Sequence, residues 1–430
     1  MLRLIRQELK QGKTLLQFGF LKGLGQGLGM IAPLVIAEYF AGEGVLGEEL
    51  YGSYSLAKTV VFFFTMILIA STQVPFIVFA NQEKAKTGKI NKAFSIQSTF
   101  LILSFCIFLA ITLSLSKYIV KFAQINRGDL LFILLAFFGI ALKTFICNLF
   151  MAMGQRVKNA LVEFTFGFFS LALIFVLYFL DWINLRTVFS VYPISAGVVL
   201  IIFVWLVDFK QLFPFELERE YFGRMFDFAK WMFLGTTAIY FINWGDNLVL
   251  RYFGSVVSTA DIGVYNVGYQ IFKGLVTLTM VVGFYFLPFI SRNIGNPDKI
   301  RDYLWRKRPM ILAPAIVCVV VLFILLPYIF GFIFGDTYRG AVNVLRVLLV
   351  GSILYLYSTF YHVIYNAANR YKILQVFNVV QAVVKVGLSL LFIPAMGLMG
   401  AAVATVISYF AKVLVLELHF QIKIKRQLKL

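Results

Sequence analysis

The sequence predicts an all-α integral membrane protein with about 12 transmembrane helices in two six-helix halves. Three observations support this prediction: the composition is very apolar, long apolar runs recur along the chain, and the segments between them are short and basic. The chain has 430 residues, of which 61% are hydrophobic and 14% charged, and it contains 48 Phe. Soluble domains are only roughly 45–50% apolar, so a soluble fold is not expected.

The individual spans follow from the thickness of the bilayer. A helix needs about 20 mainly apolar residues to cross the hydrocarbon core. This criterion predicts spans at residues 14–40, 52–80, 93–116, 128–150, 159–180, 187–207, 231–253, 262–290, 309–330, 341–366, 373–393 and 397–417.

The basic residues predict the orientation of these spans. Most of the Lys and Arg residues outside them would lie on one side if the N-terminus is cytoplasmic. Cytoplasmic loops carry the excess of positive charge. Both termini are therefore expected in the cytoplasm, and in a bacterium the protein is expected in the inner membrane.

Charge and loop length also exclude several function classes. The formal charge of +19 is explained by the topology signal, so nucleic-acid binding is not expected. The longest connection, residues 208–230, is too short for a nucleotide-binding fold, which excludes an ATPase. Cys106, Cys147 and Cys318 lie in apolar runs and lack the spacing of metal ligands. We therefore expect them to be core residues and expect no metal site. We expect no catalytic residues, no cofactor and no enzyme activity.

The chain carries a weak internal repeat. "LYGSYSLAK" and "DIGVYNVGYQ" match through Gly52 and Tyr54 against Gly263 and Tyr265, "FAQINRG" resembles "FGDTYRG", and "GQRVKN" resembles "NRYKI". All three matches have offsets of about 211–214 residues, as a duplication requires. We therefore expect six-helix bundles at 1–207 and 231–430, joined by a cytoplasmic linker at 208–230. A pseudo-twofold axis along the membrane normal would relate them.

These segments also carry a family resemblance. The "GEELYGSYSLAK" entry to span two, its repeat "STADIGVYNVGYQIFK", the "FGDTYRGAVNVLRVLL" entry to span ten and the "NAANRYK" turn resemble the polysaccharide-exporter branch of the MOP superfamily, which includes the Wzx-type O-antigen flippases. The resemblance implies a MATE-like fold and alternating access by two lobes. It implies transport of an undecaprenyl-pyrophosphate-linked oligosaccharide from the inner to the outer leaflet. The implied partners are this substrate, membrane lipids, glycosyltransferases and a polysaccharide polymerase.

Cations within the spans are the candidate substrate-binding residues. A charge at the bilayer centre costs about 2.5–3.5 kcal/mol, so deep lysines are expected to face protein or water rather than lipid. The four deepest are Lys22, Lys143, Lys273 and Lys385. An excess of positive charge stabilises an anion such as a diphosphate, so these lysines predict a net-positive cavity.

Helical spacing adds a set of polar side chains to these lysines. Lys22 and Gln26 share a helix face at i, i+4. Gln375, Asn378, Gln381 and Lys385 share another face at helical spacing. Asn243, Asp246 and Asn247 share another face. The expected supporting residues are Gln26, Asn243, Asn247, Asn378 and Gln381.

Two carboxylates are candidates for coupling transport to an ion gradient. Glu163 lies near the inner end of span five, and Asp246 lies deep in span seven. Buried carboxylates belong to proton or sodium relays, but they also neutralise nearby cations. Asp246 therefore has two interpretations: coupling, or structural pairing with a cation on another span.

Two other functions compete with the flippase. A MATE-like multidrug or cation antiporter would share the fold, but its cationic substrates require acidic groups where this chain has lysines. A membrane polysaccharide polymerase or ligase usually has a long outer loop, which this chain lacks. If the two halves rock about a central site, the segments around Gly52 and Gly263 are expected to move apart when the path opens outward.

Overall fold

The structure is a computed structural model that describes residues 2–368 and 370–424. Side chains are described from residue 17 onward, except at 281, 284, 288, 371 and 424. Within these ranges every regular secondary-structure element is a helix. This is expected for a protein that must satisfy its backbone hydrogen bonds inside a bilayer.

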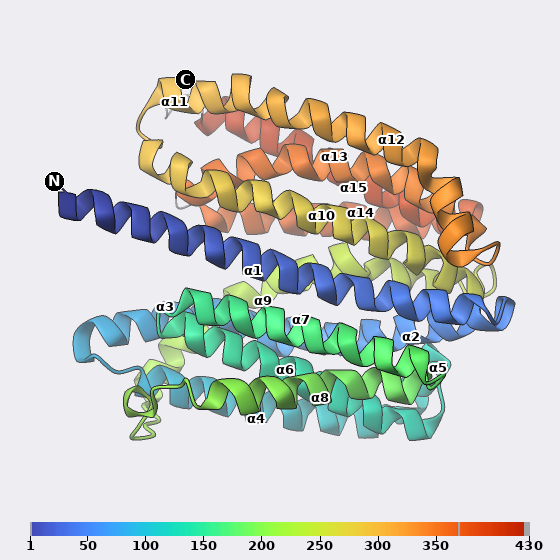
Figure 1. The fold of residues 1–430 in the computed structure, drawn as a ribbon, viewed down its shortest axis with the longest axis horizontal. Helices are drawn as coiled ribbons and strands as arrows, with labels where there is room; N and C mark the ends of the chain where they lie inside the picture. The colour runs from blue at the N-terminus through green and yellow to red at the C-terminus, as the bar shows by residue number, and fades with distance from the viewer. Residues whose placement is uncertain (1, 369, 425–430) are drawn as a thin grey trace. The chain divides into compact units, whose positions relative to one another are not determined.

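Long α-helices make up most of the chain (Figure 1). The helices of the first half are α1 (Leu2–Ala41), α2 (Val45–Phe64), α3 (Ser71–Thr87), α4 (Asn91–Ser114), α5 (Ser116–Ala123), α6 (Leu130–Ala152), α7 (Arg156–Phe179) and α8 (Leu185–Val204). Those of the second half are α9 (Arg219–Tyr252), α10 (Thr259–Asn293), α11 (Pro297–Asp302), α12 (Arg308–Phe334), α13 (Arg339–Ala367), α14 (Tyr371–Met396) and α15 (Leu398–His419). Short π or 3-10 segments are η1 (Thr65–Ala70), η2 (Arg127–Asp129), η3 (Phe209–Gln211), η4 (Tyr303–Lys307) and η5 (Phe420–Ile424).

Every predicted span overlaps a helix, which confirms the all-helical membrane fold. Among the described residues, 11 helical segments are long and apolar enough to cross a membrane. The second of them runs from Val45 to Thr87 through the π segment η1. The remaining predicted span, 231–253, lies in α9, which is 34 residues long but carries several charged side chains.

Local sequence explains where several helices begin and end. The Ser258 hydroxyl accepts a hydrogen bond from the Asp261 amide while Asp261 accepts from the Ser258 amide, which is a capping box at the start of α10. Glu83 caps α4 from outside by accepting the amides of Lys92 and Ala93. Gly88 ends α3 at a φ of 73°, a left-handed conformation that glycine adopts at low cost.

The chain folds into two compact units. Unit 1 comprises residues 1–36 and 56–237, and unit 2 comprises residues 37–55 and 238–430. The boundaries therefore fall within α1, α2 and α9. The sequence instead places its division in the connection 208–230, and it assigns residues 37–55 to the first half.

Unit 1 includes the predicted linker. Leu212, Tyr221 and Met225 belong to the same buried cluster as Phe76 and Phe150. The amide of Ile90 donates to the Gln211 carbonyl. Segment 208–221 is thus fixed to unit 1 by packing and hydrogen bonds.

An ion pair also anchors this segment. Lys92 Nζ lies 2.6 Å from Glu218 Oε2, and both side chains are exposed by about two-fifths. The hydrogen bond and the positive charge of Lys92 lower the pKa of Glu218.

Unit 2 brings the start of α2 against the start of α10. A Cβ on Gly52 would lie 2.0 Å from the Thr259 carbonyl oxygen, and one on Gly263 would lie 2.1 Å from the Glu48 carbonyl oxygen. Only glycine permits two backbones to approach so closely. Gly52 and Gly263, which the sequence repeat assigns to opposite halves, both belong to unit 2 and pack together in this structure.

The outward faces of the helices are apolar. On α12, Val317 and Tyr328 are 61% and 74% exposed, and Phe332 is 91% exposed. Such side chains suit contact with acyl chains. The prediction that all three cysteines are core residues was wrong for two of them. Cys147 is buried, whereas Cys106 and Cys318 are exposed, because the surrounding faces of α4 and α12 are exposed within the described part of the chain.

Candidate functional site

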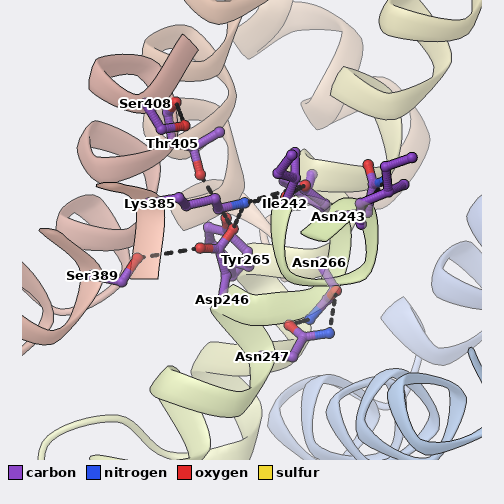
Figure 2. A network of polar contacts seen from close by, with 12 residues as sticks. Ile242, Asn243, Asp246, Asn247, Tyr265, Asn266, Lys385, Ser389, Thr405 and Ser408 are labelled. Atoms are coloured by element: carbon purple, nitrogen blue, oxygen red, sulfur yellow. Dashed lines mark hydrogen bonds and ion pairs between the residues drawn. The ribbon is translucent and has the colours of Figure 1, made fainter. Parts of the chain in front are cut away.

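A buried ion pair joins α9 to α14 in unit 2. Lys385 Nζ lies 2.6 Å from Asp246 Oδ2, and the two side chains are 1% and 3% exposed (Figure 2). From the sequence, Asp246 could pair with a cation on another span. The structure supplies the cation on another span that the pairing interpretation requires.

Hydroxyl groups from neighbouring helices complete the coordination of the Asp246 carboxylate. The Tyr265 hydroxyl on α10 donates to Oδ2 at 2.5 Å, and the Thr405 hydroxyl on α15 donates at 3.2 Å. Ser389 on α14 donates to Oδ1 at 3.4 Å. Four helices therefore meet at one carboxylate, which has the hydrogen-bond donors that a buried charge needs.

Lys385 is also satisfied on its other side. Its ammonium donates to the Ile242 carbonyl at 2.6 Å (Figure 2). It also donates to the Tyr269 hydroxyl at 3.5 Å. Because the side chain is sealed and bonded to protein, its geometry favours a structural role. This differs from the open cationic site in which the sequence placed it.

The predicted polar face of α9 also includes two asparagines close to Asp246 in the sequence. Asn247 and Asn266 exchange hydrogen bonds through their amide groups, at 3.2 and 2.8 Å. Asn243 donates to the Ile239 carbonyl of its own helix at 2.9 Å. Asn247 thus links α9 to α10 (Figure 2). Asn243 is partly exposed.

The other predicted polar side chains lie on α14 and α1. Lys412 on α15 donates to Asn378 Oδ1 at 2.9 Å, and Gln381 is fully buried. Gln26 is half-buried on α1. The polar face of α14 therefore packs against protein rather than lipid.

A second charged cluster lies in unit 1, between α1, α6 and α7. Lys143 Nζ lies 2.9 Å from Glu163 Oε1, and these side chains are 15% and 19% exposed. The Cys147 thiol lies 3.6 Å from Glu163 Oε2. Lys22 is the second cation within electrostatic range of Glu163. We call Lys22, Lys143 and Glu163 the unit 1 charge cluster.

Close helix packing positions Lys22 in this cluster. A Cβ on Gly25 would lie 2.6 Å from the Phe164 amide nitrogen, and one on Gly167 would lie 2.3 Å from the Gly25 carbonyl oxygen. The backbones of α1 and α7 thus touch at Glu163 and Phe164, one turn from Lys22. Glycine at both positions makes this approach sterically feasible.

Lys273 lies over an aromatic face in unit 2. Its Nζ is 3.4 Å from the centroid of the Trp244 ring and 4.8 Å from that of Tyr269. Such a cation–π contact attracts an ammonium group to the face of the ring. The half-buried Lys273 thus lies beside aromatic faces of the kind that stack on sugars.

The four predicted lysines therefore have different environments. Lys22 and Lys143 belong to unit 1, and Lys273 and Lys385 belong to unit 2. Within each unit the structure brings Lys143 to Glu163 and Lys385 to Asp246.

Sequence reasoning missed the groups that complete these contacts. Tyr265, Ser389, Thr405 and Asn266 bind the polar residues of α9, and Trp244 faces Lys273. Tyr265 was visible in the repeat, where it matches Tyr54, but a repeat does not indicate which carboxylate a hydroxyl contacts. Among the described residues, no group of three or more His, Cys, Asp or Glu side chains forms a metal site.

Comparison with known proteins identifies the family of this sequence. The profile of the polysaccharide biosynthesis protein family matches residues 15–294. The chain belongs to this family. An uncharacterised membrane protein of Methanocaldococcus jannaschii is 25% identical over 250 residues, which are 55% of this chain and 48% of the relative. The chain thus matches about half of the length of that relative.

Solved structures of other membrane proteins have the same fold as this chain. An inward-facing multidrug-resistance MATE transporter of the MOP superfamily matches with a TM-score of 0.76 at 14% identity, covering 93% of this chain and 95% of the other. The lipid II flippase MurJ, in an inward closed conformation, matches with a TM-score of 0.76 at 16% identity, covering 94% and 87%. The protein thus belongs to the polysaccharide biosynthesis protein family and has the fold seen in these transporters.

Proposed function

We propose that the protein is a flippase that moves an undecaprenyl-pyrophosphate-linked oligosaccharide from the inner to the outer leaflet by alternating access. The oligosaccharide would be the repeat unit of an O-antigen or of another polysaccharide. Family membership and a fold shared with a lipid II flippase support this class of substrate. The expected setting is the bacterial inner membrane with both termini in the cytoplasm, where glycosyltransferases build the substrate.

The observation that carries the proposal is the positive balance of the unit 1 charge cluster. Two lysines share one carboxylate there, since Lys143 bonds to Glu163 while Lys22 lies within electrostatic range. The cluster therefore retains a net positive charge in a partly desolvated place, where Coulomb attraction to an anion is strengthened. A diphosphate is an anion of this kind.

The MATE-like antiporter remains the alternative, because MATE transporters match the fold equally well. A multidrug cation would be repelled by the unit 1 charge cluster and by Lys273. The sign of the charge on the transported molecule therefore separates the two functions.

A reconstitution experiment tests the proposal. The full-length protein is placed in liposomes with a fluorescent lipid-linked diphosphate oligosaccharide, and its transfer between leaflets is followed with a membrane-impermeant quencher. Lys22→Ala is expected to slow transfer roughly tenfold, because a charged hydrogen bond contributes about 1.5–3 kcal/mol. Lys22→Arg should retain part of the rate.

The matched control is Lys117→Ala, which removes an exposed lysine on α5 of the same unit. It should transfer the substrate at the wild-type rate. Wild-type protein that transports organic cations but leaves the diphosphate lipid in place would support the antiporter instead. Equal rates for Lys22→Ala and Lys117→Ala would remove the assigned role of Lys22.

A further inference from the structure

A pocket of about 370 Å³ lies in unit 2, away from the lysines discussed above. It is formed where α11, η4 and the start of α12 meet the last turns of α13 and α15. Its lining includes Arg301, Trp305, Arg308, Tyr361, Glu417 and Gln421. The proposed transport function does not use any of these residues.

Arg308 is held in a fixed position in this pocket. Its guanidinium lies 4.6 Å from the centroid of the Tyr357 ring and 5.6 Å from that of Tyr361. Nη1 donates to the Tyr361 hydroxyl at 2.9 Å. A guanidinium has five N–H donors, so most of them have no protein acceptor among the described residues. The guanidinium is therefore held in place while most of its N–H donors are available to a ligand.

Neither nearby carboxylate neutralises the two arginines through an ion pair. Glu417 accepts hydrogen bonds from the hydroxyls of Tyr357 and Tyr361 and from the Gln421 amide.

Asp302 pairs with Lys307 at 3.7 Å instead of with Arg301. Arg301 is exposed and has no hydrogen-bond or ion-pair partner among the described residues. With two arginines and one carboxylate, the pocket keeps a net positive charge.

Apolar surface continues from this charged pocket. Trp305, at its rim, is 70% exposed. Exposed Leu414, Leu418 and Ile422 recur every fourth residue along α15 and η5, so they share a helix face next to Glu417 and Gln421. Tryptophan favours the bilayer interface, and leucine and isoleucine favour acyl chains. The site thus joins a positive pocket to a lipid-facing stripe.

We propose that this pocket binds the phosphate headgroup of an anionic membrane lipid. Arg301 and Arg308 bind the phosphate oxygens, since arginine recognises phosphate through paired N–H donors. Trp305 packs against the glycerol region, and an acyl chain lies along Leu414, Leu418 and Ile422. The lipid joins α11 and η4 to α15, so it stabilises this end of unit 2.

A titration of the full-length protein in detergent tests this proposal. Short-chain phosphatidylglycerol, short-chain phosphatidylcholine and glycerol 3-phosphate are added separately, and tryptophan fluorescence is compared between wild type and Trp305→Phe. Phosphatidylglycerol is expected to give a saturable change that depends on Trp305. Arg301→Gln should weaken its binding about tenfold, as loss of a charged hydrogen bond predicts.

Arg306→Gln is the matched control, because Arg306 is exposed on the same η4 segment but does not line the pocket. It should bind phosphatidylglycerol like wild type. Equal weakening in both variants would overturn the pocket in favour of general surface charge. Equal binding of phosphatidylcholine would also overturn it. If glycerol 3-phosphate binds as tightly as the lipid, the ligand is a free phosphate and the lipid assignment fails.

Discussion

At the residue scale, two buried charges of unit 2 neutralise each other. Asp246 and Lys385 form an ion pair that is almost fully buried, and three hydroxyl groups complete the coordination of the carboxylate. Removing one partner of such a pair leaves an uncompensated charge, whereas replacing both with neutral groups leaves none. Stability should therefore depend on the pair rather than on either charge alone.

The first mutational prediction follows from this contrast. Lys385→Met is expected to lower the free energy of unfolding by about 3–5 kcal/mol, because Asp246 is left buried and unpaired. The double variant Lys385→Met, Asp246→Asn should recover most of this loss. Thermal or denaturant unfolding of the purified protein measures both effects.

An exposed ion pair on the same helix as Asp246 provides the control. Lys230 Nζ lies 2.7 Å from Asp227 Oδ1, with side chains 56% and 68% exposed. Lys230→Met should cost under about 1 kcal/mol, as is usual for exposed pairs. If Lys385→Met costs no more than Lys230→Met, or if the double variant shows no recovery, the pairing interpretation fails. Transport that no longer responds to an ion gradient in stable Asp246→Asn would favour coupling instead.

At the scale of helices, glycine positions determine how closely two spans approach. Within α1, Gly25 touches the backbone of α7, whereas a Cβ on Gly27 would meet nothing within 4 Å. These residues are two positions apart and so point in different directions. The same substitution should therefore have opposite effects at the two sites.

Gly25→Ala is expected to destabilise the protein by about 1–3 kcal/mol, because the added methyl group forces α1 away from α7. Gly27→Ala should be neutral or stabilise by up to about 1 kcal/mol, since alanine is the better helix former. Unfolding midpoints of the two variants, compared with wild type, measure this difference. Equal midpoints would show that α1 and α7 do not pack as described.

At the scale of the whole molecule, the two units are linked through helices rather than through a loop. The unit boundaries lie at residues 36–37 in α1, 55–56 in α2 and 237–238 in α9. Segment 208–221 packs into unit 1 and does not behave as a free linker. Any relative motion of the units must therefore be absorbed within these three helices.

Alternating access predicts that a distance between the two units changes with substrate while a distance within one unit does not. Spin labels at Lys117 in unit 1 and Ser255 in unit 2 should show a distance distribution that shifts when a lipid-linked diphosphate oligosaccharide is added. A ligand shifts a conformational equilibrium only if it binds the two states with different affinity. Pulsed electron paramagnetic resonance of the reconstituted protein measures the distributions.

Labels at Glu49 and Ser255 serve as the control, because both exposed residues belong to unit 2. Their separation should not change with substrate. A fixed Lys117–Ser255 distance, in protein shown to transport, would contradict motion of one unit against the other. The pair Ser53 and Val264 is unsuitable, since both residues are buried within unit 2.

Sequence alone determined the membrane class, the helices and the deep polar residues of this protein. Hydrophobic runs are a local property whose length must match the bilayer, so each predicted span overlaps a helix. The cost of a charge in lipid likewise predicts that Lys22, Lys143, Lys273 and Lys385 face protein or water. Helical spacing predicts that Asn243, Asp246 and Asn247 share a face; Asp246 and Asn247 are both buried, whereas Asn243 is partly exposed.

Only the tertiary structure decided which of these residues meet. Lys385 lies 139 positions from Asp246 in the chain, and no local pattern encodes a contact between helices so far apart. The assignment of residues 37–55 to unit 2 has the same cause, because the close approach at Gly52 and Gly263 depends on how α2 packs against α10. Spacing along one helix fixes the direction of a side chain, but the partner in that direction is set by packing between helices.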